Sequence, residues 1–92
     1  MTMDTDDLRL DGNAEAGPLA ELFGRDMTMT AAVCASCGAE SPVGSLLAYD
    51  PGLGFVLRCV HCDAAVIRVA RIRGGYCLDA RGASLLRVPV AR

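Results

Sequence analysis

Apolar residues recur with a helical period in the first third of the chain. Leu19, Leu22 and Phe23 are spaced i, i+3 and i+4, which makes one apolar stripe on an amphipathic helix. Residues that can cap, start or stop this helix flank the stripe: Asp11 or Asn13, Pro18 and Gly24. We predict a short helix over residues 14–23, with Gly17-Pro18 either bending it or marking its start. Its expected role is to cover a small sheet, with docking to a partner as the alternative.

From residue 31 the pattern changes to short strands separated by turns. The predicted strands form two hairpins and a closing strand: 45–50 and 55–59 around PGLG, 64–72 and 76–81 around RGG, and 84–90. Pro89 in the last strand favours the edge of a sheet. The fold class predicted is small α+β, an N-terminal helix on antiparallel β-hairpins. We expect a flexible acidic N-terminus over residues 1–10 and one domain over residues 11–92.

The composition limits how stable such a domain can be. The chain has 92 residues, with two Phe, two Tyr and no Trp, so its core must be aliphatic. Chains of this size seldom gain more than a few kcal/mol from a core alone, so an additional cross-link is expected.

Hydropathy and charge suggest where the protein resides. No segment reaches the roughly 18 apolar residues of a membrane span, and the first residues are acidic, unlike a signal peptide. We therefore expect a cytoplasmic protein with reduced cysteines and no membrane association. Residues 1–30 carry seven acidic side chains against two arginines, whereas residues 31–92 carry four against seven. The protein as a whole is slightly acidic.

Four of the five cysteines form two Cys-x-x-Cys pairs. Cys34 and Cys37 are separated from Cys59 and Cys62 by 21 residues. In a reducing compartment this spacing indicates a metal site, and it is close to the four-cysteine zinc pattern. Zinc prefers four soft ligands in a tetrahedron, and a tight turn can present both sulfurs of one pair. The hairpin between the pairs is expected to bring them to one end of the sheet, around one zinc ion.

Such a turn needs a residue that tolerates positive φ directly after its second cysteine. Gly38 satisfies this requirement in the first turn. Asp63 occupies the same place in the second, and Asp adopts this conformation more readily than most residues. His61 lies between two ligands with its side chain directed away from the ion, and we interpret it as solvated or as shielding the sulfurs. Cys77 is expected to be a half-buried, unreactive thiol.

Four cysteine ligands leave a tetrahedral ion no open position. A catalytic zinc keeps three protein ligands and a water, and no nearby Glu-His pair suggests a general base. The sequence therefore predicts a structural metal and no enzymatic activity.

The paired turns around a hairpin resemble a zinc ribbon. Further, "LDGNAEAGPLAELFGRDMT", "CASCG", "LRCVHC" and "LDARG" are similar to segments of a family of short actinobacterial proteins known only as a domain of unknown function. The similarity extends from Leu10 over nearly the whole chain. It implies a ribbon with Cys34, Cys37, Cys59 and Cys62 as ligands and brings no activity with it.

Three functions follow as hypotheses. The first is a non-catalytic interaction module that meets a protein partner through the helix or an open sheet edge. The second is a rubredoxin-like electron carrier with iron in the same site, although the chain has few of the aromatic residues that surround such sites. The third is nucleic-acid binding through six arginines: Arg58, Arg68, Arg71, Arg73, Arg81 and Arg87. The balanced charge, the acidic pI of about 5.1 and the few aromatics disfavour the third.

Overall fold

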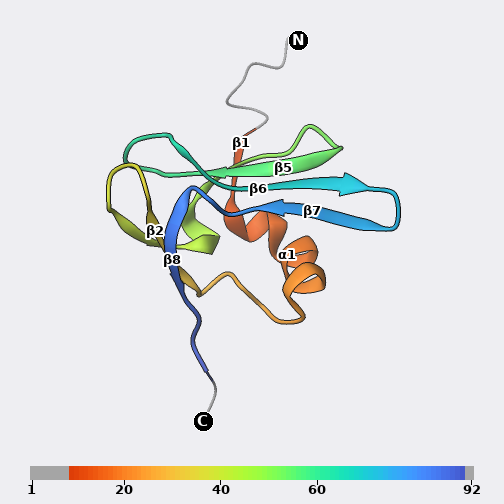
Figure 1. Cartoon of the computed structure of the whole chain (residues 1–92), viewed down its shortest axis with the longest axis horizontal. Helices are drawn as coiled ribbons and strands as arrows, with labels where there is room; N and C mark the ends of the chain where they lie inside the picture. The colour runs from red at the N-terminus through yellow and green to blue at the C-terminus, as the bar shows by residue number, and fades with distance from the viewer. Residues whose placement is uncertain (1–8, 91–92) are drawn as a thin grey trace.

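The strands of this protein form two antiparallel sheets. A computed structural model describes residues 9–90 (Figure 1). The larger sheet has the order β1 (Arg9–Asp11), β4 (Leu47–Tyr49), β5 (Gly54–Arg58), β6 (Ala65–Ile72) and β7 (Gly75–Asp79). The smaller has the order β3 (Glu40–Pro42), β2 (Ala31–Cys34) and β8 (Ala83–Arg87). The predicted α+β class is confirmed, but with two sheets in place of the single one expected.

The two predicted hairpins are present in the larger sheet. β4 pairs with β5 across the PGLG loop, and β6 pairs with β7 across a two-residue turn. The closing strand β8 instead pairs with β2 at the edge of the smaller sheet, and Pro89 lies just beyond its end. The hairpin of β2 with β3 was not predicted, because three residues are too few to show an alternating pattern.

The helical segment begins as a 3-10 turn. This turn, η2, covers Gly12–Glu15 and leads into α1 (Ala16–Phe23). The predicted end of the helix at residue 23 is confirmed, and the regular α-helix starts at residue 16, two residues after the predicted start. The Asp11 carboxylate accepts a hydrogen bond from the Asn13 N–H at 3.1 Å. Gly24 ends the helix at φ 74°, where its N–H bonds to the Ala20 carbonyl.

The apolar stripe of α1 faces the core. Leu19 is fully buried, and Leu22 and Phe23 pack against the same cluster on one face of the larger sheet (Figure 1). This arrangement favours the covering role of the helix over docking. Within residues 9–90, no helix is long and apolar enough to cross a membrane.

The larger sheet includes two residues that precede the predicted boundary at residue 11. Arg9 and Leu10 pair with Tyr49 and Ala48, so they belong to the sheet and not to an N-terminal tail. Residues 1–8 of the predicted tail lie outside the described residues.

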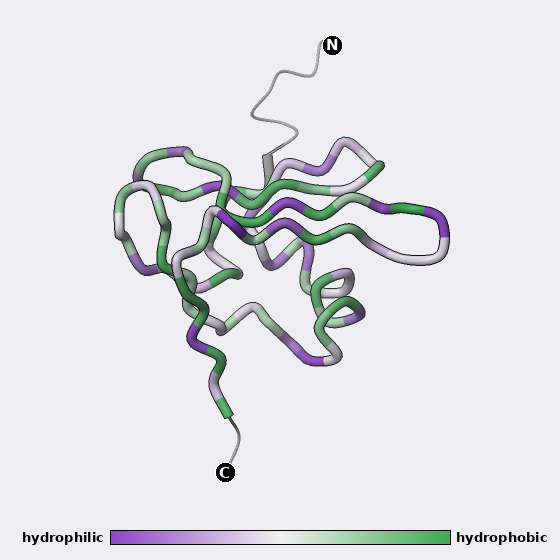
Figure 2. The backbone as a smooth tube through the Cα atoms, in the orientation of Figure 1, coloured by the Kyte–Doolittle hydropathy of each residue, from purple (hydrophilic) through white to green (hydrophobic). Residues whose placement is uncertain are grey.

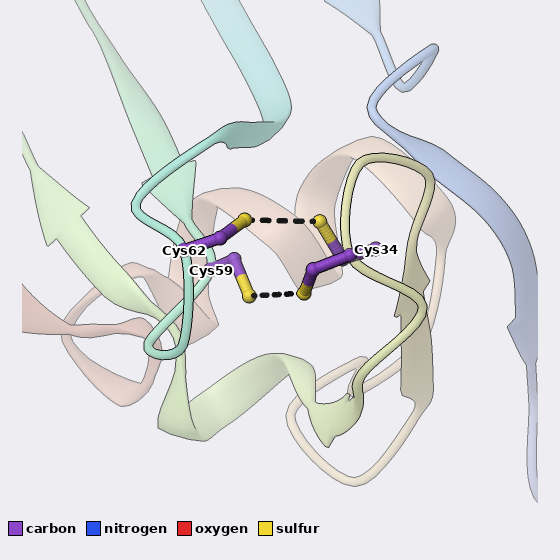
Figure 3. Close-up of side chains that lie close together, drawn as sticks. Cys34, Cys59 and Cys62 are labelled. Carbon is purple, nitrogen blue, oxygen red and sulfur yellow. Dashed lines mark hydrogen bonds between the residues drawn. The ribbon is translucent and has the colours of Figure 1, made fainter.

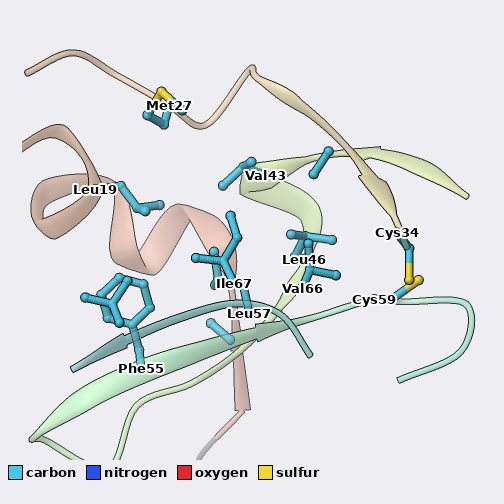
Figure 4. Packing of buried hydrophobic residues seen from close by; sticks show 13 residues of the cluster. Leu19, Met27, Cys34, Val43, Leu46, Phe55, Leu57, Cys59, Val66 and Ile67 are labelled. Carbon is cyan, nitrogen blue, oxygen red and sulfur yellow. The ribbon is translucent and has the colours of Figure 1, made fainter. Parts of the chain in front are cut away.

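The core lies between the sheets and α1 and is almost entirely aliphatic (Figure 4). Its buried members are Leu19, Met27, Ala32, Cys34, Val43, Leu46, Ala48, Phe55, Leu57, Cys59, Val66, Ile67 and Val69. Polar and apolar positions alternate along the central strands, so one face of the larger sheet is turned toward the solvent (Figure 2). Cys34 and Cys59, two of the four cysteines of the predicted metal site, are part of this core.

Gly82 joins the two sheets where the chain passes from β7 to β8. Its carbonyl accepts a hydrogen bond from the Ala35 N–H at 2.8 Å, beside the first cysteine pair. A Cβ on Gly82 would lie 1.9 Å from the Ala65 carbonyl oxygen, beside the second pair. Only glycine permits this approach, which places Gly82 between the segments that carry the two cysteine pairs.

Glu15 is a buried carboxyl group in η2 that sequence analysis did not identify. It is 3% exposed, and its Oε2 has no hydrogen-bond partner. Burial, together with a hydrogen bond to Asp50 and that group's negative charge, raises the pKa of Glu15 to about 7, against an opposing effect of Arg71. The neutral acid is therefore the form that the fold prefers.

Glu15→Gln should flatten the pH dependence of stability. A carboxyl whose pKa rises from 4.5 to about 7 on folding stabilises the native state fully below pH 4.5, and this contribution is lost as the pH rises through 7. The loss is on the order of 3 kcal/mol. We expect the variant to match the wild type near pH 5 and to exceed it at pH 8 in urea unfolding. Glu21→Gln, at an exposed position on α1, is the control and should change neither value.

Gly82→Ala should destabilise the protein by about 2–3 kcal/mol, because the new methyl group would clash with the backbone of Ala65 and Val66 and must push it away. Gly17→Ala is the matched control. A Cβ there meets nothing within 4 Å, and replacing a helical glycine should add about 0.5–1 kcal/mol. Urea unfolding measures both. Equal stabilities for the two variants would refute this role of Gly82.

Candidate metal centre

The two cysteine pairs sit in turns with the same hydrogen-bond pattern. In the first, the Cys34 N–H bonds to the Ala39 carbonyl at 2.9 Å and the Gly38 N–H bonds back to the Cys34 carbonyl at 2.8 Å. In the second, the Cys59 N–H bonds to the Ala64 carbonyl and the Asp63 N–H to the Cys59 carbonyl, both at 2.9 Å. We call these turns knuckle 1 (34–39) and knuckle 2 (59–64). Each is closed by its own backbone.

Both knuckles use a left-handed residue at the predicted position. Gly38 has φ 79° and Asp63 has φ 64°, and Asp63 is the one non-glycine residue with positive φ in the described part of the chain. The Arg58 guanidinium donates to the Asp63 carbonyl at 3.0 Å, which supports the second turn. Aspartate therefore performs in knuckle 2 the conformational role that glycine performs in knuckle 1.

The strands deliver the knuckles to one place. Cys34 is the last residue of β2, and Cys59 directly follows β5. In each sheet the pairing register shifts just before the cysteine, between Val33 and Cys34 and between Leu57 and Arg58. Such bulges bend a strand, and here they turn the two chain segments toward each other.

The four sulfur atoms converge across the gap between the knuckles. Cys34 and Cys62 face one another with their sulfurs 3.7 Å apart, and the sulfurs of Cys37 and Cys59 are 3.6 Å apart (Figure 3). All four lie within 4.8 Å of one another. A tetrahedral zinc with bonds of about 2.3 Å separates its sulfurs by about 3.8 Å, whereas a disulfide requires about 2.05 Å. The arrangement fits one ion held by four thiolates and does not fit two disulfides.

The cluster has a buried side and an open side. Cys34 and Cys59, the first cysteine of each knuckle, are 3% and 2% exposed, while Cys37 and Cys62 are exposed to solvent. An ion here would be anchored in the core and reachable from outside on one side only.

Backbone N–H groups and neighbouring thiols shift the pKa values of Cys34 and Cys37 in opposite directions. The N–H of Cys37 contributes most to lowering the pKa of Cys34 to about 7, with help from the Ser36 N–H and the Cys62 thiol and against the effect of burial. For Cys37 the largest effect is the Ala39 N–H, which lowers its pKa. Burial and the thiols of the other three cysteines outweigh this effect and raise it to about 11. The Cys34 thiolate therefore forms more readily than the Cys37 thiolate, which a nearby cation would favour.

The remaining predicted residues lie at or beyond the rim of the site. His61 is exposed in knuckle 2, and its backbone N–H, not its ring, contacts the Cys59 sulfur at 3.4 Å. Cys77 lies on β7, outside the cluster, and is exposed, so the expectation of a half-buried thiol is wrong. Within residues 9–90, its strand lies at the edge of the larger sheet. Sequence reasoning missed Gly82, for which "LDARG" gave no separate structural signal.

The six arginines do not form one free basic surface. Four of them bind groups of the chain itself: Arg58 the Asp63 carbonyl, Arg71 the Gly52 carbonyl, Arg81 the Asp79 carboxylate and Arg87 the Glu40 carboxylate. The two ion pairs are solvent-exposed, and one of them links β8 to β3.

Comparison with known proteins adds the family and no function. Searches of curated proteins and of solved structures give no match for this chain. A family match covers residues 4–91 and so includes both knuckles, α1 and all eight strands. With this match over nearly its whole length, the chain belongs to DUF6510, a family of unknown function.

Proposed function

We propose that this protein is a non-catalytic zinc ribbon, in which one zinc ion has a structural role and the folded domain serves as a cytoplasmic interaction module for a protein partner. The observation that carries the proposal is the convergence of four sulfurs from two matching knuckles at the junction of the two sheets. Cys34, Cys37, Cys59 and Cys62 would be the ligands.

The knuckle geometry supports zinc as the ion. Sulfur separations of 3.6–3.7 Å suit a tetrahedral thiolate site, and zinc has no geometric preference that opposes this arrangement. A bound dication would stabilise the Cys37 thiolate, which burial and the neighbouring thiols otherwise disfavour. Binding to such a site is worth on the order of 10–16 kcal/mol in zinc-finger peptides, and in a small domain this free energy stabilises the fold.

The ligand set supports a structural role. The candidate cluster in the described part of the chain consists of cysteines alone, and four protein ligands fill a tetrahedral ion. His61 is directed to solvent beside it and has no carboxylate pairing among its described contacts. The site therefore offers a fixed cross-link between sheets, and we infer no enzymatic activity.

Protein is the partner class that the surface favours. Most of the arginines considered for nucleic-acid binding are engaged within the chain, and the overall charge is slightly negative. The larger sheet, in contrast, presents a solvent-facing side with a shallow apolar groove of about 360 Å³. Its lining includes Tyr49, Leu53, Val56 and Ala70. An apolar surface of this kind is typical of contacts with other proteins.

Elemental analysis of the purified protein should find one zinc per chain and a colourless solution. Iron in the same four-thiolate site, the arrangement of a rubredoxin-like electron carrier, would give a red protein with a visible absorption spectrum. The culture medium should contain both metals so that availability does not decide the outcome. One iron per chain under these conditions would replace the structural proposal with the redox one, and no metal would refute both.

Cys34→Ala and Cys59→Ala should unfold the domain or drive it into aggregates, because each removes a buried ligand and opens the core. Cys77→Ala and His61→Ala are the controls. Both should keep one zinc and a cooperative thermal transition within a few degrees of the wild type. Circular dichroism and metal content are measured on all four variants. Identical melting curves for the ligand and control variants would disprove the ligand assignment.

A further inference from the structure

β7 is a free edge of the larger sheet, and its backbone is arranged to accept another strand. Within residues 9–90, it pairs with β6 only. Ile72 and Gly75 flank the two-residue turn and so form a hydrogen-bonded pair, after which the pattern alternates. Gly75, Cys77 and Asp79 therefore direct their N–H and C=O groups toward β6. The corresponding groups of Tyr76 and Leu78 point outward from the edge.

The other sheet edges carry features that discourage pairing. β1 and β3 have three residues each, and β3 ends in Pro42 and begins with Glu40, which binds Arg87. β8 has a bulge against β2 and is followed by Pro89, whose carbonyl accepts a hydrogen bond from Arg25. β7 has five residues in unbroken register, without proline, and without a charged side chain before Asp79. Short strands, prolines, bulges and charges are the usual protection of an edge, and β7 lacks them.

The sequence of β7 is complementary to itself in one register. In an antiparallel pair centred on Cys77, Tyr76 of each copy lies opposite Leu78 of the other. In each such pair, the outward N–H of one residue donates to the outward C=O of the other in both directions. The Tyr76 and Leu78 side chains also make an apolar cross-strand pair. Asp79 lies opposite Gly75, so no like charges face each other within the strand. The two Cys77 residues form the central non-hydrogen-bonded pair, with Cα atoms about 4.5 Å apart.

We propose that two copies of this chain associate through their β7 edges in this register, which joins the two larger sheets into one continuous sheet. The inference rests on the proposed function, since it names the open edge and the partner of the interaction module. One short strand from each copy makes a small contact, so the dimer forms reversibly and depends on protein concentration.

Sedimentation velocity of the reduced, zinc-loaded full chain over a concentration series tests the association. We expect a monomer–dimer equilibrium that Leu78→Lys weakens by at least about tenfold, since a lysine on the edge opposes pairing. Leu85→Lys on the β8 edge is the matched control. Leu78 and Leu85 are 39% and 42% exposed, so the two variants make the same surface change on different edges. A dimer weakened by Leu85→Lys and not by Leu78→Lys would overturn the assignment to β7.

Cys77 tests the register. Diamide, an azo oxidant, can convert the two central thiols to a disulfide. Each thiol gives up a proton and an electron, and the azo group takes up both pairs to become a hydrazine. The expected Cα separation lies within the 4.4–6.8 Å range of disulfides. We expect a linked dimer on non-reducing gels for the wild type and Leu85→Lys, much less for Leu78→Lys, and none for Cys77→Ser. Equal linkage in Leu78→Lys would indicate random collision and refute the register.

Metal content and circular dichroism of the same samples separate the two proposals. A folded protein with one zinc that stays monomeric at every concentration, or that binds a foreign strand in place of its own copy, would overturn the β7 dimer alone. A dimer of the expected behaviour that contains no metal would overturn the structural zinc site and leave the edge pairing standing.

Discussion

Four thiol groups held within 4.8 Å of one another are the constraint on which the rest of this fold depends. Each knuckle is closed by its own backbone hydrogen bonds, but the knuckles follow strands of different sheets and come together at their sulfurs and near Gly82. Neighbouring thiols affect each other's protonation: the pKa of Cys34 is lowered while that of Cys37 is raised. A dication would favour the thiolate form of these cysteines. It would also hold together two sheets that are each too small to have a core of their own.

The parts of the structure that depend on neighbouring residues were predictable. The knuckles follow from cysteine spacing and from one left-handed residue, so Gly38 and Asp63 could be identified in advance. The same holds for the stripe of Leu19 and for the two hairpins with Gly-containing turns. The division into two sheets was not predictable. β2 pairs with β8 some 50 residues later, and nothing in either strand specifies that partner over the adjacent hairpin.

The residues that sequence analysis missed or misplaced have roles created by distant contacts. Glu15 looks like a solvated helix residue, and it is buried because η2 packs near Asp50 of the β4–β5 loop. Gly82 looks like an ordinary turn glycine, and its importance comes from the carbonyl of Ala65. Cys77 was expected to be half-buried, but it lines the groove on the solvent-facing side of the larger sheet, so the thiol is open.

The metal centre and the free edge are connected through the chain path. β7 runs from the turn at Gly74 back toward the knuckles, and Gly82 then packs against Ala65 and binds the Ala35 N–H. The chain just after β7 is thereby held near both knuckles, while within residues 9–90 the strand pairs on one side only. A cross-link near the end of β7 would help this five-residue edge strand to keep its shape, since a hairpin of this length has little stability of its own. A structural ion would thus hold an interaction surface in a defined shape without touching whatever binds there.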